Sequence, residues 1–348
     1  MSKKIGILTG GGDAPGLNQV IRAAVFYGVR NFGYEFVAIE DGWKGLLEGK
    51  SRPLTVDEVR DWIYEGGTLI GSSRTNPFKH EDGGKICREN FEKMGLDAII
   101  ALGGEDTLGV AYKLYKEYEI PTVGAPKTID NDLPGTDQCF GFDTAINRVM
   151  EAFDRLRTTA RSHHRILVVE VMGRHAGWMT LVGGIAGGAD IILLPEEPFD
   201  LDGVAEQLKK LREQGRQYAL VAVSEGAKLK FAEGMDIITQ DAELDEFGHV
   251  RLGGIAKVLA KELQKRTDWE ARHVVLGHLQ RGGAPTAFDR WFATQLGVAA
   301  VEQIAKDNYG VMVVLKEGKI VPVSLEEAAK GIRTVPEELV EFKKIFEP

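Results

Sequence analysis

A short segment with two carboxylates carries the residues best suited to chemistry. It reads Pro-Lys-Thr-Ile-Asp-Asn-Asp over residues 126–132. Asp130 could accept a proton from a substrate hydroxyl as a general base. Asp132 could hold Mg²⁺, which needs only one or two protein carboxylates when phosphate oxygens also bind it. Lys127 could neutralise a phosphoryl group during its transfer. The segment therefore indicates phosphoryl transfer, with a solvated acidic turn as the alternative.

Arginines near the predicted strand ends indicate an anionic substrate. They are Arg74, Arg165, Arg174, Arg272 and Arg281. The planar guanidinium group matches the geometry of phosphate, whereas a single surface arginine is more often part of an ion pair. Because the chain as a whole carries a net charge of −9, this concentration of arginine favours a small, highly anionic substrate.

Short apolar strands that alternate with helices must position these residues. The predicted strands are residues 5–9, 36–39, 98–102, 121–124, 165–171, 191–194, 219–223 and 274–276, and the predicted helices are 17–29, 110–118, 144–161 and 176–187. Continuous apolar strands between helices are typical of parallel sheets covered on both faces. The pattern therefore predicts an α/β fold with two doubly wound, mostly parallel lobes. Residues 227–248 fit it poorly and are expected to form an excursion.

Glycine-rich turns follow nearly all of the strands, where ligands bind in such sheets. They are residues 10–13, 103–107, 126–132, 172–174, 224–226 and 277–283. The first opens a helix, so its backbone N–H groups could bind an anion, although a tight turn capped by Asp13 is the alternative. Pro15 breaks the dinucleotide-binding pattern, but Glu40 could still mimic its ribose-binding acid, so a dinucleotide fold is kept as a minor alternative.

Composition limits the class of protein. With 348 residues, 43% hydrophobic and 27% charged, the chain is typical of a folded globular protein. Its acidity argues against a nucleic-acid partner. Cys87 and Cys139 form no disulfide framework and suit a reducing compartment. The first residues do not have the pattern expected of a signal peptide, and no apolar run approaches the roughly 20 residues that cross a bilayer. The sequence therefore predicts a cytoplasmic protein with no nucleic-acid or membrane partner.

Several long stretches resemble the phosphofructokinase family. They are residues 5–18, 126–132, 168–174 and 276–283, in the family's order and over nearly the whole chain. The resemblance implies transfer of a phosphoryl group to the 1-hydroxyl of fructose 6-phosphate, with Mg²⁺ as cofactor. It also implies two lobes: a donor lobe of residues 1–141 plus about 280–330 and a sugar lobe of residues 142–279 plus about 331–348.

The resemblance implies roles for individual residues. Asp130 looks like the general base, with Thr128 beside it, and Gly11 and Gly104 would hold the donor phosphates. Glu105 stands where ATP-using members carry a magnesium-binding aspartate. The residues expected at the sugar are Met172, Gly173, Arg174 and Glu225, and those at its 6-phosphate end are His278 and Arg281. Arg165 and Arg272 match arginines that reach across from a neighbouring subunit, which implies a homodimer or homotetramer with shared active sites.

Two departures from the ATP-using pattern bear on the phosphoryl donor. Those members typically read Gly-Gly-Asp-Gly-Ser and Pro-Gly-Thr-Ile-Asp-Asn-Asp. This chain has Asp106 in place of the glycine before the serine of the first motif, and Lys127 in place of the glycine after the proline of the second. The pair is similar to pyrophosphate-dependent members. A carboxylate at Asp106 would repel the α-phosphate of ATP, whereas Lys127 alone discriminates less because some ATP-using relatives carry it. ATP as donor is the alternative, and a catalytically silent sugar-phosphate sensor is a remoter one. Phe26 replaces an effector-site arginine, so a nucleotide effector site is not expected.

Overall fold

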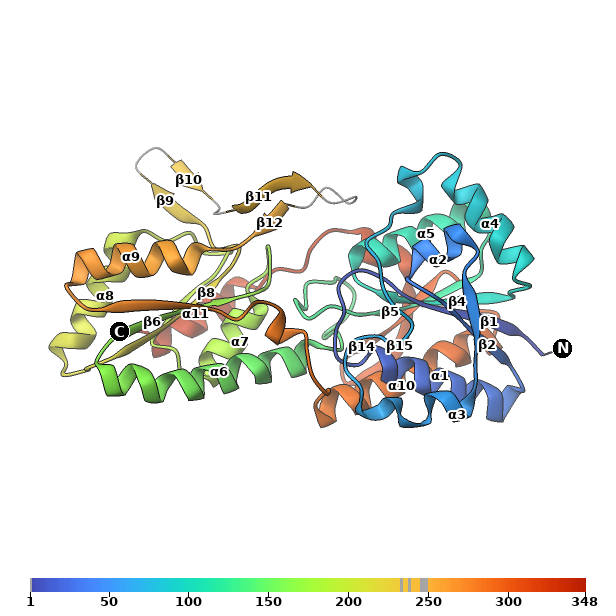
Figure 1. The fold of residues 1–348 in the computed structure, drawn as a ribbon, viewed down its shortest axis with the longest axis horizontal. Helices are drawn as coiled ribbons and strands as arrows, with labels where there is room; N and C mark the ends of the chain where they lie inside the picture. The colour runs from blue at the N-terminus through green and yellow to red at the C-terminus, as the bar shows by residue number, and fades with distance from the viewer. Residues whose placement is uncertain (1, 232–233, 237–238, 245–249) are drawn as a thin grey trace.

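The apolar strands form two separate sheets, one in each of two lobes that lie end to end (Figure 1). The computed structural model describes residues 2–231, 234–236, 239–244 and 250–348. The N-terminus lies at the free end of the first lobe, and the C-terminus lies on the second. The predicted α/β class with mostly parallel sheets is confirmed.

The first sheet has seven strands in the order β15-β14-β5-β4-β1-β2-β3. Its members are β1 Lys4–Thr9, β2 Glu35–Ile39, β3 Ser51–Leu54, β4 Ala98–Gly103, β5 Thr122–Pro126, β14 Val311–Lys316 and β15 Lys319–Ser324. Strands β14, β5, β4, β1 and β2 are parallel, while β3 and β15 close the edges in antiparallel pairing. The carboxyl ends of β1, β4 and β5 therefore meet along one side of the sheet.

Helices cover both faces of this sheet. Alternate residues of β1 face opposite sides, so Ile5 and Ile7 pack into one core and Leu8 into the other. The first core receives α1 Leu17–Phe32, α3 Val56–Val59 and α10 Ala287–Ala305, and the second receives α2 Trp43–Glu48, α4 Gly83–Lys93 and α5 Glu105–Tyr118. Single 3₁₀ turns span Arg60–Tyr64, Pro77–Lys79, Gly277–Gln280, Leu325–Ala329 and Lys344–Phe346.

The start of α5 corrects the sequence prediction. The helix was expected to begin at Val110, but it begins at Glu105, directly after the end of β4. Carboxylates in the first turn of a helix are stabilised by the unpaired N–H groups and the helix dipole. Glu105 and Asp106 are therefore held on a helix and not on a loop, which fixes the direction of both side chains.

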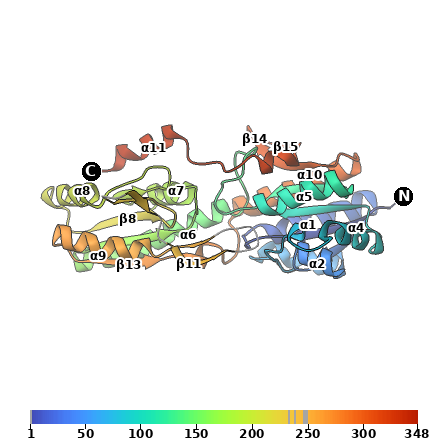
Figure 2. The same cartoon turned by 90° about the horizontal axis from the view of Figure 1, so that it is seen from above.

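The second sheet has four parallel strands in the order β13-β6-β8-β7. They are β6 Ile166–Val171, β7 Ile191–Leu193, β8 Ala219–Ser224 and β13 Ala271–Val275. Helices α6 Phe142–His163, α7 Trp178–Ala186 and α11 Glu337–Lys343 pack on one face, and α8 Leu201–Glu213 and α9 Ile255–Thr267 on the other. Figure 2 shows α11 against the outside of this lobe. The prediction that β13 spans 274–276 is wrong: Arg272 lies within the strand.

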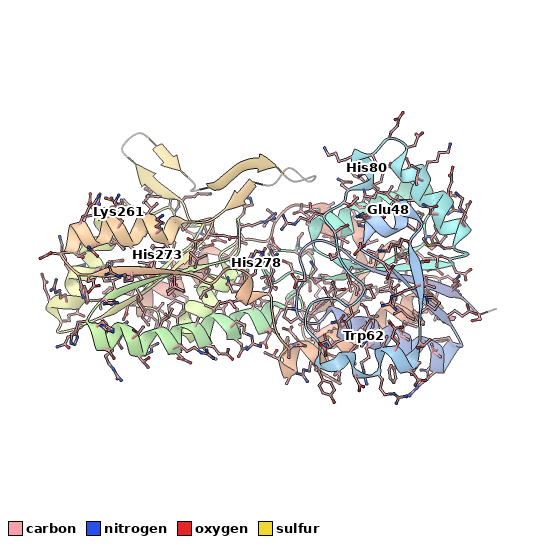
Figure 3. The ribbon with its side chains drawn as sticks, in the orientation of Figure 1. Glu48, Trp62, His80, Lys261, His273 and His278 are labelled. Carbon is pink, nitrogen blue, oxygen red and sulfur yellow. The ribbon has the colours of Figure 1, made fainter. Side chains whose placement is uncertain are left out.

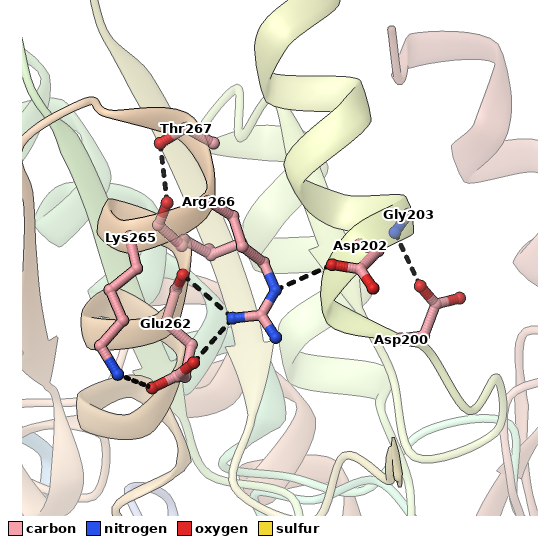
Figure 4. Close-up of polar contacts among 8 residues, drawn as sticks. Asp200, Asp202, Gly203, Glu262, Lys265, Arg266 and Thr267 are labelled. Carbon is pink, nitrogen blue, oxygen red and sulfur yellow. Dashed lines mark hydrogen bonds and ion pairs between the residues drawn. The ribbon is translucent and has the colours of Figure 1, made fainter. Parts of the chain in front are cut away.

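The expected excursion contains two short antiparallel pairs that project from the second lobe (Figure 1). They are β9 Leu229–Phe231 with β10 Gly234–Asp236, and β11 Thr239–Leu244 with β12 Val250–Leu252. The rest of the excursion, residues 232–233, 237–238 and 245–248, lies outside the described residues. Below it, α8 and α9 are joined at the surface by Arg266, which donates to Asp202 at 2.9 Å and to Glu262 at 2.7 Å (Figure 4).

A buried carboxylate joins the two lobes. Asp289 on α10 accepts hydrogen bonds from the backbone N–H groups of Gly141 at 3.0 Å and Thr144 at 2.8 Å. These N–H groups belong to the first turn of α6, which lacks a side-chain cap of its own. Asp289 therefore supplies the cap from another helix, and this fixes α6 against the first lobe. Among the described residues, none of the helices combines the length and hydropathy needed to span a bilayer.

Candidate active site

The carboxyl ends of β1, β4 and β5 open into one cleft. It is lined by the predicted residues Gly11, Gly104, Glu105, Asp106, Lys127, Thr128, Asp130, Asp132, Arg174 and Arg281. The cleft also includes Asp13, Arg74, His175 and Ile332. Segments more than 200 residues apart in the chain therefore contribute to one site, as the rule for parallel sheets predicts.

Two glycines at the floor of the cleft leave space beside two cationic side chains. Gly11 adopts a left-handed conformation with φ of 77°, and its N–H donates to the carbonyl oxygen of Ser73 at 2.9 Å. A Cβ atom at Gly11 would lie 3.5 Å from Lys127 Nζ, and one at Gly12 would lie 3.0 Å from the Arg281 guanidinium. A side chain at either position would fill the space beside these cations, so the glycines leave room for an anionic group.

The segment after β5 holds a buried carboxylate oxygen that lacks a hydrogen-bond partner within the described part of the chain. The backbone N–H of Asp130 donates to Thr128 Oγ1 at 3.0 Å, and that hydroxyl donates to Asp132 Oδ1 at 3.2 Å. Thr128 therefore fixes both acidic positions. In contrast, Asp130 Oδ1 is buried without a hydrogen-bond partner among the described residues. A buried acceptor left open in this way is costly unless a ligand satisfies it.

Burial shifts the pKa values of the two central groups toward neutrality. The pKa of Asp130 is raised to about 6: the loss of solvent and the charge of Asp132 raise it, and the cations Arg281, Arg174 and Lys127 oppose them. Burial also lowers the pKa of Lys127 to about 8, with Arg281 adding to the effect. Between these values the site holds a carboxylate base and an ammonium cation at the same time.

The acidic residues after β4 and β5 are compatible with a divalent cation. Burial raises the pKa of Glu105, and the charge of Asp106 adds to it. Burial likewise raises the pKa of Asp132, with Glu105 contributing. Neither carboxylate therefore has enough positive charge nearby to cancel the effect of burial on its pKa. The described residues contain no group of three or more side chains spaced to enclose a metal ion. The donor set suits Mg²⁺, which binds one or two carboxylates and otherwise phosphate oxygens.

Two backbone N–H groups and a carboxylate form the side of the site that the second lobe supplies. Met172, Gly173 and Arg174 follow β6, and the N–H groups of Gly173 and Arg174 point at Glu225 Oε1, at 3.4 and 3.2 Å. Gly173 has φ of 141°, and a Cβ there would lie 2.6 Å from the carbonyl oxygen of Ala176, so the turn requires glycine. Burial raises the pKa of Glu225 to about 7, with Asp130 adding to it.

The turn after β13 completes this side. His278 is exposed and lies where the two lobes meet, whereas His273 lies farther back along the strand (Figure 3). Gln280 is fully buried and accepts a hydrogen bond from the Met172 N–H at 3.3 Å. The sequence analysis placed Gln280 in a candidate turn but gave it no role. The sequence indicated a role for it only by placing a polar residue inside that turn.

Arg165 and Arg272 lie at the other end of the second sheet. Arg165 precedes β6, and Arg272 is the second residue of β13, so both lie near the amino ends of their strands. Both pair with Glu270, at 3.1 and 2.6 Å. They therefore do not approach the cleft of their own chain, unlike Arg174 and Arg281.

The chain is similar to known proteins along nearly its whole length. The family model described as phosphofructokinase matches residues 4–304. The pyrophosphate–fructose 6-phosphate 1-phosphotransferase of Streptomyces coelicolor is 51% identical over 343 residues, 99% of each chain. ATP-dependent 6-phosphofructokinase 3 of that organism is 48% identical, covering 96% of this chain and 97% of that protein. The solved pyrophosphate-dependent phosphofructokinase of Marinobacter aquaeolei has a TM-score of 0.81 at 25% identity, covering 97% of this chain and 86% of that one.

Proposed function

Because the chain belongs to the phosphofructokinase family, we propose that it transfers a phosphoryl group from pyrophosphate to the 1-hydroxyl of fructose 6-phosphate, with Asp130 as the general base. The products are fructose 1,6-bisphosphate and inorganic phosphate, and the reaction belongs to glycolysis. Full-length relatives with this activity in their names support the donor and the acceptor. The observation that carries the mechanism is the buried Asp130 Oδ1, which has no hydrogen-bond partner among the described residues and lies within reach of the charges of Lys127 and Arg281.

Asp130 removes the proton from the sugar 1-hydroxyl as that oxygen attacks the phosphorus. The bond from the bridging oxygen to the transferred phosphorus breaks, and the remaining phosphate leaves. Asp130 suits this role because its pKa of about 6 leaves it ionised at neutral pH yet basic enough to accept a proton. Thr128 bonds the Asp130 backbone N–H and thereby holds the base in place.

Positive charge in the cleft stabilises the charge that develops on the transferred group and on the leaving phosphate. Lys127 lies at the cleft floor beside Gly11, and Arg281 lies beside Gly12. Gly104 and Gly11 allow the donor phosphates to approach the backbone closely. Arg174, Met172, Gly173, Glu225 and His278 form the proposed sugar contacts.

Family members generally use a divalent metal, and we take Mg²⁺ as the ion here. Glu105 and Asp132 would hold it, since both are carboxylates at the cleft whose pKa values are raised by desolvation and by a neighbouring acidic group. When bound, Mg²⁺ neutralises the negative charge of pyrophosphate. Asp106 neighbours Glu105 on the first turn of α5 and would exclude the α-phosphate of ATP.

Assembly and location form the last part of the proposal. Arg165 and Arg272 are turned away from their own cleft and would serve the sugar-phosphate site of a neighbouring subunit. The enzyme would then be a homodimer or homotetramer with shared active sites. A cytoplasmic location agrees with a phosphorylated sugar substrate and with two buried cysteines, Cys87 and Cys139, that form no disulfide.

A coupled assay for fructose 1,6-bisphosphate, run separately with pyrophosphate and with ATP, tests the proposal. We expect turnover with pyrophosphate and Mg²⁺ and little with ATP. A preference for ATP would support the alternative that this chain uses the same donor as its 48% identical ATP-dependent relative. No turnover with either donor, in protein that still binds fructose 6-phosphate, would support the sensor alternative.

A further inference from the structure

Arg333, from the segment before α11, binds the backbone of the loop that carries the acidic residues. Its Nε and Nη2 atoms donate to the carbonyl oxygen of Asn131, at 3.2 and 3.0 Å. Its Nη1 atom donates to the carbonyl oxygens of Thr136 and Asp137, at 3.1 and 2.8 Å. The backbone N–H of Arg333 donates to the carbonyl oxygen of Asp132 at 2.7 Å. One residue thus fastens both ends of this loop.

The loop conformation requires external support. Asn131 lies between the proposed base and the second carboxylate, and its φ of 54° is in the left-handed region. Residues other than glycine adopt this conformation at a cost, and they keep it only where surrounding contacts impose it. The two bonds from Arg333 to the Asn131 carbonyl oxygen fix the orientation of that peptide group. They therefore help to set where Asp130 and Asp132 point.

The other side of Arg333 is anchored in the second lobe. Trp178, the first residue of α7, donates from Nε1 to the Arg333 carbonyl oxygen at 2.9 Å, and its ring centroid lies 4.5 Å from the guanidinium carbon. Two residues later, the N–H of Val335 donates to Glu196 Oε1 at 2.9 Å, and the same oxygen accepts from the Gly177 N–H. The segment around Arg333 is therefore held by the lobe that carries the sugar contacts.

We propose that Arg333 is a positioning residue for the reaction: it holds the loop with Asp130 and Asp132 in its reactive geometry by tying that loop to α7 of the sugar lobe. This inference rests on the proposed function only for its kinetic consequence. Arginine is required because its planar group donates to three carbonyl oxygens at once, whereas lysine has one nitrogen and a different geometry.

The kinetic test compares Arg333→Ala and Arg333→Lys with Arg88→Ala. Arg88 is a matched control because it also donates to backbone carbonyl oxygens, those of Tyr118 and Glu119, away from the cleft. We expect kcat to fall about 10- to 100-fold in both Arg333 variants, because small displacements of reacting groups are costly. KM for fructose 6-phosphate should stay within about threefold of wild type, since no sugar contact is removed. Arg88→Ala should retain wild-type kcat.

Added guanidinium distinguishes positioning from a general loss of structure. Guanidinium chloride at low millimolar concentration, far below denaturing levels, should raise kcat of Arg333→Ala several-fold. Sodium chloride at equal ionic strength should have no such effect, and neither salt should alter Arg88→Ala. A kcat for Arg333→Ala within about twofold of wild type would overturn the proposal. A lowered kcat that guanidinium does not raise, in protein with a wild-type melting temperature, would also overturn it.

Hydrogen exchange provides a test independent of activity. The amide N–H groups of residues 131–133 and 135–139 should exchange about tenfold faster in Arg333→Ala than in wild type, while those of β4 should not change. Unchanged exchange in the loop would refute the positioning role even if the wild-type protein proved inactive with both donors. Faster exchange confined to the loop, in an inactive wild type, would support the positioning role and count against the proposed function alone.

Discussion

The ammonium group of Lys127 donates a hydrogen bond to the carbonyl oxygen of Gly12. This contact joins the segment after β5 to the loop after β1, so the cation lies at the base of the proposed donor site. Asp106 lines the same cleft from the first turn of α5. The proposed donor site is thus built from the carboxyl ends of three adjacent strands, with a cation after β5 and an anion after β4.

The choice of donor should depend on Asp106 more than on Lys127. We expect Asp106→Gly to weaken the use of pyrophosphate and to admit some ATP, because like charges in a partly desolvated site repel strongly enough for discrimination of about 10³ or more. Asp106→Asn keeps nearly the same side-chain volume but removes the charge, so it shows whether charge or size excludes ATP. Lys127→Gly should lower pyrophosphate turnover without admitting ATP. The measurement is kcat/KM for both donors. If neither Asp106 variant uses ATP, other residues must also close the nucleotide site.

Substitution of the base should affect turnover far more than binding. Asp130→Asn keeps the size of the side chain but removes its basicity, so kcat should fall by roughly 10² to 10⁴. Binding of fructose 6-phosphate, measured by calorimetry, should persist. Thr128→Val offers a milder comparison, since it removes the hydroxyl that bonds the Asp130 N–H and Asp132. Near-normal turnover of Asp130→Asn would rule out the assignment.

The activity should have a bell-shaped dependence on pH. Asp130 must be ionised to act as a base, so kcat/KM should decline below a pH of about 6, its raised pKa. Lys127 must be protonated to act as a cation, so activity should decline above about 8, its lowered pKa. The profile should be recorded with saturating Mg²⁺ at constant ionic strength. Full activity at pH 4.5 would contradict the role of Asp130 as the base, and unchanged activity at pH 10 would contradict the role of Lys127 as a cation.

Shared active sites should permit complementation between inactive subunits. If Arg165 and Arg272 serve a neighbouring subunit, Arg272→Ala and Asp130→Asn homo-oligomers should each have low activity. Hybrids formed by unfolding and refolding a mixture should recover some activity, because a fraction of their sites contains neither substitution. Mass spectrometry verifies that hybrids have formed. A fully active monomer on size exclusion, or verified hybrids without recovery, would argue against shared sites.

The lobe junction should make stability depend on pH through Asp289. Burial raises the pKa of Asp289 in the folded protein to about 6, against an ordinary value of 3.8. Its ionisation therefore opposes folding, and this cost is absent below about pH 4 and complete above about pH 6. As pH rises through this window, the free energy of unfolding of wild type should fall relative to Asp289→Asn. Denaturant titrations at pH 4.5 and 7.5 measure the change, and a pH-independent difference would contradict it.

The sequence by itself determined the strands, the glycine turns and the edge of the first sheet where chemistry could occur. Apolar strands and helical spacing are local patterns, and parallel strands bring their carboxyl ends together whatever the later folding details. This is why Gly11, Asp106, Lys127 and Asp130, each placed after a predicted strand, line one cleft. The family and the reaction followed from long motifs at these same positions. The lobe boundaries and the individual site roles are still predictions.

Only the tertiary structure decided which side chains support that site from a distance and which lie away from it. Arg165 and Arg272 looked like further strand-end arginines, but their positions near the amino ends of β6 and β13 pair them with Glu270 instead. Arg333 bonds carbonyl oxygens of residues about 200 positions earlier, and Asp289 caps a helix that begins 147 positions earlier. These are long-range bonds to backbone groups, which every residue carries, so no local sequence pattern identifies the partner. Their pairing exists only once the two lobes have packed.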